Sequence, residues 1–389
     1  MLAQVTHSRR WYDSGDQPSY GAATQHGQSD NRPERKVTAR MALIVHVAYF
    51  PLARKGDNQH SVSLKLTNGM IRAGHAVLNF SDRDVARAGS FFGHRFFGRA
   101  YANRTLIQFC RVHRPDILVL GHADIILPET VASIREDLPR LRVLQWNVDP
   151  MFEPANVARL QSKLGVVDAT LVSTSGAALA PLRRTGMRLG FLPNPVDFSI
   201  ERGTNHLQPD LPYDLFYACG NPARPLRMVC GQAWDMDDLM LFLLGRLPGL
   251  RTIFGGLLGN PRITGADLRT VLESTALGLN ISRRADHSLY SSDRLPQLIG
   301  NGIVPLIERS TGYDTLFADN EMGFFASLDE LVERIDTLSR DPARRMAVGA
   351  AGRARYHALF NETRIARYLI DVALDRCDPA DYEWPTLIA

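Results

Sequence analysis

Short apolar runs alternate with helical patterns along most of this chain, and the alternation limits the folds that it can adopt. We expect strands at 42–48, 76–80, 116–120, 142–146, 169–173, 213–219, 251–255, 276–281, 303–307 and 322–326. Helices are expected from about 128, 154 and 175, and at 237–247, 265–274, 292–300, 328–339, 342–358 and 362–376. A first helix, with Val62, Leu66, Met70 and Ile71 on one face, ends at Gly74. The repeated strand–helix–strand order predicts an α/β fold of parallel sheets with helices on both faces.

The alternation is interrupted once, which divides the chain into two doubly wound domains. Pro193-Asn194-Pro195 breaks the pattern, and a polar stretch at 199–212 follows. With 389 residues, 45% of them hydrophobic, the chain is long enough for two ordinary cores. The sequence predicts a disordered tail at 1–40, a Rossmann-like domain at 41–205 and a second at 206–361, and the helical segment 362–389 is a candidate to pack back onto the first domain. Ligands of such sheets bind beside the carboxyl ends of the strands, so we expect the domains to face each other across a cleft.

The composition argues against a membrane-spanning, disulfide-bonded or nucleic-acid-binding protein. The longest apolar block, Leu239 to Leu244, is far shorter than the roughly 18 residues that span a bilayer. Scattered cysteines suit a reducing compartment, and a net charge of +4 is too small for a dedicated nucleic-acid binder. We expect a bacterial, cytoplasmic protein, with peripheral contact to the inner face of the plasma membrane as an alternative.

A predicted strand at 277–281 leads through a loop to a short helix that can hold an anion. Ser291, Ser292 and Asp293 offer capping side chains, and Arg294 lies in the first turn. Free N–H groups and the positive dipole at a helix start attract anions, and the guanidinium adds a formal charge. These residues predict a seat for a diphosphate. A capped helix with a solvent-facing arginine is the alternative.

Several motifs of the second half follow one another in the order known from one enzyme family. They are Asn280-Ile281-Ser282, Ser292-Asp293-Arg294, Gly302 with the strand 303–307, Glu321-Met322-Gly323-Phe324-Phe325, and Ser327-Leu328-Asp329-Glu330-Leu331. Over about 275–370 the chain resembles GT-B glycosyltransferases of the family 1 and family 4 type, particularly the group related to spore-maturation glycosyltransferases. The resemblance implies a GT-B fold with a nucleotide-sugar site in the second domain.

The chain departs from this family where donor-binding glutamates are expected. Counted back from Gly302, those positions hold Gln297 and Leu289. Gln297 can still hydrogen-bond a ribose hydroxyl, but it lacks the charge, so the retaining assignment of the family does not carry over. A glycine-ended strand before this segment leads into further residues that suit a phosphate. The expected donor site comprises Arg294, Ser292, Asp293, Gln297, Gly220, Asn221, Arg224, Asn280, Ser282 and Glu321.

In the first domain, two predicted strands end in polar residues on the cleft side. His122 and Asp124 follow the strand 116–120 and are the candidate catalytic residues, because a histidine with a pKa of about 6.5 suits proton transfer. A histidine bonded to the backbone is the alternative. After the next strand, Trp146 can stack on a sugar or pack in the core, and Asp149 can bind hydroxyls. By resemblance to the first loop of GT-B enzymes, Gly56, Asp57 and Asn58 complete the acceptor side.

The segment 89–104 combines paired phenylalanines with arginines. As a helix, it would place Phe92, Phe96 and Phe97 on one face, with arginines around them. Such a segment can lie on an anionic membrane or on a lipid-linked acceptor. A core helix with a solvated rim is the alternative.

The resemblance implies a nucleotide-sugar-dependent glycosyltransferase of the hexosyltransferase type, acting in cell-envelope biosynthesis on a glycan, lipid-linked or cell-surface polysaccharide acceptor. A nucleotide-sugar epimerase of the same fold and a non-catalytic GT-B-like binding protein are the alternatives. No cofactor, metal ion or nucleic acid is expected. Asp235-Met236-Asp237 has the letters of a metal-binding D-x-D motif, but its position predicts a helix cap.

Overall fold

The computed structural model describes residues 41–52, 59–219 and 226–388. Residues 41–389 form one compact unit. The predicted tail at 1–40 lies outside the described residues. Within the part of the chain that the structure describes, no helix has the length and apolar character needed to cross a membrane.

A seven-stranded sheet contains the strands of the first half of the chain and one short strand near residue 388. The strands are β1 (Leu43–Ala48), β2 (Ala76–Ser81), β3 (Ile117–Gly121), β4 (Arg142–Asn147), β5 (Ala169–Val172), β6 (Arg188–Phe191) and β14 (Leu387–Ile388), in the order β14-β6-β5-β4-β3-β1-β2. All neighbours pair in parallel except β14, which is antiparallel to β6. The inner strands are mostly apolar and buried because helices cover both of their faces, although β1 contains His46 and β4 contains Gln145.

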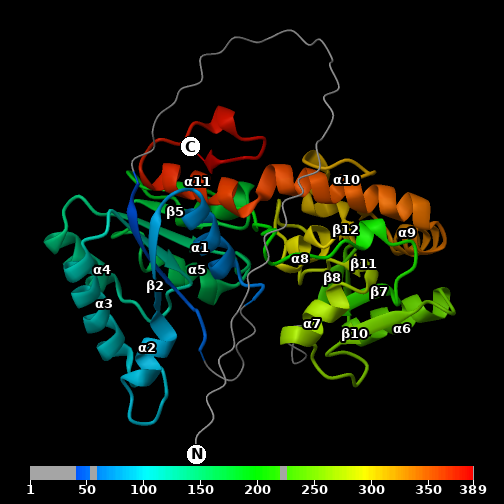
Figure 1. Ribbon diagram of the computed structural model, residues 1–389, viewed down its shortest axis with the longest axis horizontal. Coiled ribbons are helices and arrows are strands. Elements are labelled where there is room, and N and C mark those ends of the chain that lie inside the picture. The colour runs from blue at the N-terminus through cyan, green and yellow to red at the C-terminus, as the bar shows by residue number, and fades with distance from the viewer. Residues whose placement is uncertain (1–40, 53–58, 220–225, 389) are drawn as a thin grey trace, which may run out of the picture. The chain divides into compact units, whose positions relative to one another are not determined.

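Two layers of helices cover this sheet, and alternate strand residues face each layer. The helices are α1 (Val62–Arg72), α2 (Asp82–Ala88), α3 (Arg99–His113), α4 (Pro128–Asp137), α5 (Pro154–Gln161) and α11 (Glu362–Ala373), with the 3-10 helix η1 (Gly176–Leu182). In β3, Ile117 and Val119 belong to the apolar cluster with α1 and α11, whereas Leu118 and Leu120 belong to the cluster with α3 and α4. α11 lies directly against α1 (Figure 1). Gly69 permits this contact, since a Cβ there would lie 2.0 Å from the carbonyl oxygen of Glu362.

A second, five-stranded sheet is entirely parallel. Its strands are β7 (Tyr213–Ala218), β10 (Thr252–Gly255), β11 (Thr275–Leu279), β12 (Val304–Glu308) and β13 (Gly323–Phe325), in the order β10-β7-β11-β12-β13. The accompanying helices are α6 (Met236–Arg246), α7 (Gly265–Leu272), α8 (Arg294–Gly300), α9 (Leu328–Arg340) and α10 (Pro342–Phe360), and β8 (Arg227–Val229) and β9 (Gln232–Trp234) form a hairpin. Short 3-10 helices lie at η2 (Asn205–Leu207), η3 (Arg309–Thr311), η4 (Tyr313–Thr315) and η5 (Pro379–Asp381).

One apolar cluster extends through both sheets. It contains Ile44 and Trp146 of the first sheet, Leu295 and Ile299 of α8, and Tyr356 of α10. Apolar contacts continue from one sheet to the other and so mark no boundary between two domains. The domain boundary expected between 205 and 206 therefore stays a prediction.

A buried cluster of charges joins α1 to the segment after β6 and to α11. Lys65 and Glu201 are both fully buried, and Lys65 Nζ lies 2.5 Å from Glu201 Oε1. Arg72 Nη1 lies 2.8 Å from both Asp197 Oδ1 and Glu362 Oε1. The main-chain N–H of Asp197 donates to Glu201 Oε2 at 2.9 Å. Each charge therefore has a partner, which is the condition for keeping charges inside a protein.

The predicted α/β architecture is confirmed, and most strands and helices lie within a few residues of their expected bounds. Asp235 caps α6 as expected, accepting a hydrogen bond from Asp237 N at 2.9 Å. Two local predictions are wrong. Ile71 is exposed and does not share the buried face of α1. Residues 89–98 form a turn and α3 begins only at Arg99, so the helix expected over 89–104 does not include the phenylalanines.

Candidate active site

The carboxyl ends of β3 and β4 bring His122 and Asp149 together. His122 follows β3 directly and has the left-handed backbone conformation, with φ of 48°, which is uncommon for any residue with a side chain. Its Nδ1 lies 3.3 Å from Asp149 Oδ2. Its Nε2 accepts a hydrogen bond from the main-chain N–H of Val148 at 3.2 Å. An accepting Nε2 places the ring proton on Nδ1, so neutral His122 donates to Asp149 and both ring nitrogens are occupied.

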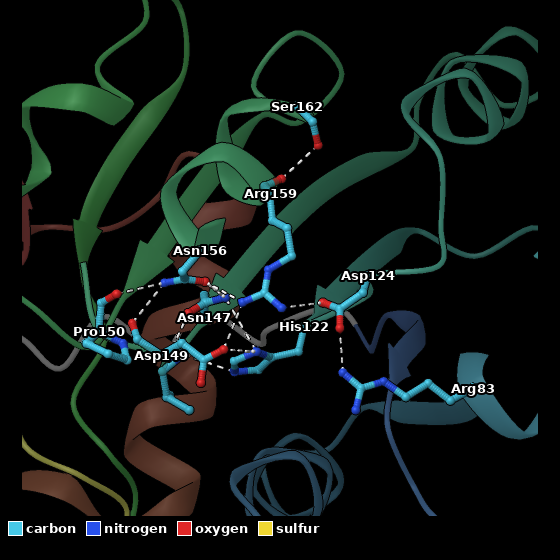
Figure 2. Close-up of polar contacts among 10 residues, drawn as sticks. Arg83, His122, Asp124, Asn147, Asp149, Pro150, Asn156, Arg159 and Ser162 are labelled. Atoms are coloured by element: carbon cyan, nitrogen blue, oxygen red, sulfur yellow. Dashed lines mark hydrogen bonds and ion pairs between the residues drawn. The ribbon is translucent and has the colours of Figure 1, made fainter. Parts of the chain in front are cut away.

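Asp149 is an ionised carboxylate that has two side-chain partners. Arg159 Nη2 lies 2.9 Å from Asp149 Oδ2, the same oxygen that His122 contacts (Figure 2). Burial alone would raise the pKa of Asp149, but the hydrogen bond from His122, together with the charge and hydrogen bond of Arg159, outweighs it and lowers this pKa to about 2. Because nearly half of the Asp149 side chain is exposed, it can offer an oxygen to a ligand while its orientation stays fixed.

Asp124 lies between two arginines. Arg83 Nη2 of α2 lies 2.6 Å from Asp124 Oδ2, and Arg159 Nη1 of α5 lies 3.3 Å from Oδ1. Figure 2 shows the Arg159 guanidinium reaching toward Asp124 and Asp149 at once. Both carboxylate oxygens of Asp124 therefore already have a guanidinium partner.

Trp146 lies in the core and is 1% exposed. Its Nε1 donates to His46 Nε2 at 3.2 Å, and its ring contacts His122 edge-on at 5.4 Å between centroids. Gly121 makes room for the indole, since a Cβ there would lie 2.2 Å from it. In this structure the ring is therefore packed inside, as in the core alternative, and is not presented to a sugar.

Asp82, the first residue of α2, adds a fully buried carboxyl group beside Arg83. Burial raises the pKa of Asp82 to about 6, the charge of Arg83 opposes the rise, and the Asp124 carboxylate adds to it. Above this pH the protein therefore holds a buried negative charge, which costs stability.

Replacing Asp82 with asparagine is expected to stabilise the fold at about pH 7.5 by about 1–3 kcal/mol and to change little at about pH 4. The folded-state pKa of about 6 exceeds the ordinary value of 3.8. The native state therefore holds the proton more tightly, and the stability contributed by the protonated carboxyl is lost as the pH rises through 6. Urea unfolding at both pH values measures this. Asp238→Asn is the control, because Asp238 is an exposed acid in the first turn of α6. An equal gain from both substitutions would contradict the assignment.

On the second sheet, Arg294 lies at the carboxyl ends of β7 and β11. Its Nη2 donates to the carbonyl oxygen of Ala218 at 2.9 Å, and its Nη1 donates to that of Ile281 at 3.2 Å. The guanidinium also covers the Tyr217 ring at 4.5 Å. Ser292 Oγ lies 3.5 Å from Arg294 Nη1 and donates to Asn280 Oδ1 at 3.3 Å. Arg294, Ser292 and Asn280 thus lie together as expected, and Arg294 does not point freely into solvent.

The other expected donor residues are more scattered. Asp293 precedes α8 without capping it through its side chain, and Gln297 and Ser282 are half-buried. Glu321 lies before the amino end of β13, and its carboxylate accepts from Ala318 N at 2.9 Å. Since carboxyl ends of parallel strands share one edge, Glu321 lies toward the opposite edge from Arg294. Gly56, Asp57, Asn58, Gly220, Asn221 and Arg224 lie outside the described residues.

The loops that follow β4 and β11 contact each other, which sequence reasoning missed. Glu153 forms an ion pair with Arg283, whose guanidinium covers the Phe152 ring at 5.1 Å. The Phe152 ring contacts Tyr290 at 5.8 Å between centroids. Burial raises the pKa of Tyr290, and the Asp149 carboxylate raises it further. The charge of Arg294 opposes this rise.

Glu308 is a further residue that the sequence motifs did not indicate. It ends β12, where Oε2 accepts from Cys230 N at 3.0 Å and Oε1 accepts from Ser310 Oγ at 2.6 Å. With Met228 and Arg284 it lines an open pocket beside the β8–β9 hairpin. The sequence signal that could have indicated Glu308 was an acidic residue at the end of a predicted strand. The residues around it match no motif of the family.

Comparisons with known proteins agree with this geometry. Residues 224–371 match a family model described as glycosyl transferase-like. No curated protein sequence matches the chain. Among solved structures, Anabaena HepE in complex with UDP and glucose is 10% identical, covering 86% of this chain and 100% of that chain, with a TM-score of 0.52. A UDP-forming trehalose-phosphate synthase from Burkholderia xenovorans is 10% identical, covering 86% and 99%, with a TM-score of 0.55.

At such low identity these likenesses establish the fold alone, and the subgroup related to spore-maturation glycosyltransferases stays a prediction. The chain has the GT-B fold of glycosyltransferases, and its segment 224–371 is similar to the glycosyl transferase-like family.

Proposed function

We propose that this chain transfers a sugar from a nucleoside-diphosphate sugar to a hydroxyl group of an acceptor. The observation that supports this best is the position of Arg294. It lies at the carboxyl edge of the second sheet, bonded to main-chain oxygens after β7 and β11, within the segment that matches the family model. Structures of the same fold are described in complex with UDP and with UDP-glucose, so UDP sugars are the first donors to test.

In this proposal Arg294 compensates the charge that develops on the departing diphosphate. Its two bonds to carbonyl oxygens fix the guanidinium before the reaction, so little reorganisation is needed as the charge grows. Arginine supplies the compensation, and we keep the prediction that the reaction requires no metal ion or cofactor.

On the acceptor side, the geometry favours Asp149 as the group that touches the substrate. Its carboxylate is ionised, half-exposed and oriented by His122 and Arg159. A fixed carboxylate of this kind can accept a hydrogen bond from the attacking hydroxyl. His122 then acts as a positioning residue, because both of its ring nitrogens are bonded. The assignment of His122 and Asp124 as catalytic residues stays a prediction.

The finer features of the proposal come from the resemblance. They are a hexose as the transferred sugar, a glycan, lipid-linked or cell-surface polysaccharide as the acceptor, a role in the bacterial cell envelope and a cytoplasmic location. The phenylalanine-rich turn before α3 provides a separate reason to consider a lipid surface.

In a panel of UDP-, GDP- and CMP-linked sugars, the protein is expected to use one class of donor, either by hydrolysing it or by transferring its sugar to an acceptor. The preferred donor should also stabilise the fold by about 2.7 kcal/mol when present at about one hundred times its dissociation constant. Thermal unfolding and nucleotide release measure the two effects. Release of free nucleotide without an acceptor indicates a transferase, whereas a changed sugar still attached to its nucleotide indicates the epimerase. Binding without either product indicates the non-catalytic alternative.

A further inference from the structure

A turn at 89–98, between α2 and α3, exposes four phenylalanines. Phe91, Phe92, Phe96 and Phe97 are 98%, 80%, 69% and 68% exposed. The turn projects beyond the ends of both helices (Figure 1). We call these four side chains the aromatic turn. Contiguous exposed aromatic surface of this kind is unusual on a protein with no partner for it.

The four rings contact one another and not the core. Phe91 and Phe92 meet edge-on at 5.3 Å between centroids, and Phe96 and Phe97 meet at 5.8 Å. Phe92 and Phe97, at 6.4 Å, link the two pairs. The rings therefore form one patch that the fold presents outward.

The base of the turn is closely packed, which keeps the patch in place. A Cβ on Gly98 would lie 1.6 Å from the carbonyl oxygen of Ala86, and one on Gly89 would lie 2.3 Å from the Tyr101 ring. Asn103 Nδ2 donates to the carbonyl oxygen of Ile125 at 2.9 Å and so ties α3 to the loop after β3. The exposed aromatic groups thus stand on a fixed support.

The segment that carries the aromatic turn is positively charged, although two of its arginines, Arg87 and Arg111, form ion pairs with Asp84 and Asp137. Residues 85–115 contain six arginines and no aspartate or glutamate. The whole chain has 45 basic and 41 acidic residues, a net charge of +4, so the remaining residues, with 39 basic and 41 acidic, carry −2. Arg95 and Arg104 are exposed, and among the described residues neither forms an ion pair. A partner for this surface must therefore be apolar where it meets the rings and anionic around them.

We propose that the aromatic turn inserts into the interface of an anionic phospholipid bilayer, with Arg95 and Arg104 on the headgroup phosphates. Phenylalanine rings bury their apolar faces at the acyl boundary, and guanidinium groups bind phosphate oxygens in pairs. α2 also carries Arg83, which contacts Asp124, so the same helix connects the lipid-facing turn to the candidate acceptor side. Lipid binding and sugar transfer are separate properties, and each can fail without the other.

The full chain is expected to bind vesicles of phosphatidylglycerol and phosphatidylcholine in flotation assays, and to bind pure phosphatidylcholine vesicles at least about tenfold more weakly. Rising salt should weaken the binding, because part of the attraction is electrostatic. The double variant Phe91→Ser, Phe92→Ser should lose about tenfold or more of the affinity, since each inserted ring contributes substantially. The double variant Arg95→Gln, Arg104→Gln should lose the preference for anionic lipid.

Matched controls remove the same chemistry elsewhere. Leu207→Ser with Leu241→Ser removes two exposed apolar side chains, and Arg140→Gln with Arg262→Gln removes two exposed charges; both should bind as the unchanged chain does. Phe92→Trp should show more quenching by brominated lipid than the unchanged chain, whose four tryptophans give the background, and its unfolding transition should match that of the unchanged chain. The proposal is wrong if the unchanged chain does not bind vesicles, or if the control variants lose as much binding as the phenylalanine and arginine variants. It is also wrong if the unchanged chain self-associates through the phenylalanines and does not bind vesicles.

Discussion

Replacing Arg294 with alanine is expected to slow sugar transfer by about 100- to 1,000-fold, the loss typical for removing a fixed group that stabilises developing charge. The guanidinium is held by the carbonyl oxygens of Ala218 and Ile281. The same bonds mean that the substitution also costs stability, by about 1–3 kcal/mol. Turnover at saturating donor, measured well below the unfolding temperature, separates the two effects.

Two further variants make this test specific. Arg294→Lys keeps the positive charge but loses the planar fork, so its rate should fall between those of the unchanged protein and Arg294→Ala. Arg262→Ala removes an exposed arginine after β10 and should leave the rate unchanged. A rate that falls only in proportion to the unfolded fraction would show that Arg294 is structural, and the proposed donor site would then be wrong.

Replacing Glu201 with glutamine is expected to lower the free energy of unfolding by about 3–5 kcal/mol, because it leaves the buried Lys65 ammonium without its counter-charge. Lys65 Nζ and Glu201 Oε1 are 2.5 Å apart and fully buried. Glutamine can still accept the hydrogen bond from Asp197 N, so the expected loss reports the missing charge. Chemical denaturation of the full chain measures it.

The double variant Lys65→Met, Glu201→Gln is the informative comparison, because glutamine keeps the acceptor for Asp197 N. Removing both charges together should restore much of the stability, since no unpaired charge stays behind. Asp329→Asn breaks the exposed ion pair with Arg246 and should cost less than about 1 kcal/mol. If the double variant is as unstable as Glu201→Gln, the pair contributes through packing and not through charge.

Most of the fold could be predicted because parallel strands covered on both faces are mostly apolar. β3 is a fully buried apolar run of this kind, and β4 is buried after its first residue although it includes Gln145. The strands that were missed, β6, β8, β9 and β14, have two to four residues each. Segments so short carry no periodicity, and they pair only because tertiary contacts bring them to a partner.

The aromatic turn shows the limit of periodicity as a predictor. The phenylalanines at 92, 96 and 97 have helical spacing, but Gly93 and Gly98 lie among them. Gly93 has a φ of 63°, and the close approach of Gly98 to Ala86 belongs to a turn. Local backbone geometry therefore overrides the apolar pattern here.

The candidate site could be located, but its internal bonds could not be predicted. Strand ends placed His122 and Asp149 at one edge, and the structure brings them into contact. Arg83 and Arg159 come from helices far apart in the sequence, and nothing in either helix marks its arginine as a partner of Asp124. The burial of Trp146 depends on the space left by Gly121, which no sequence pattern encodes.

The return of α11 and β14 to the first sheet has a consequence for biosynthesis. While the ribosome is still producing residues 206–361, Gly69 faces no partner, and the outer edge of β6 is open. The first sheet is therefore complete only after residues 362–388 have been synthesised and have packed against it. A nascent chain stalled short of them should thus expose apolar surface and recruit chaperones, even though every parallel strand of that sheet has already emerged.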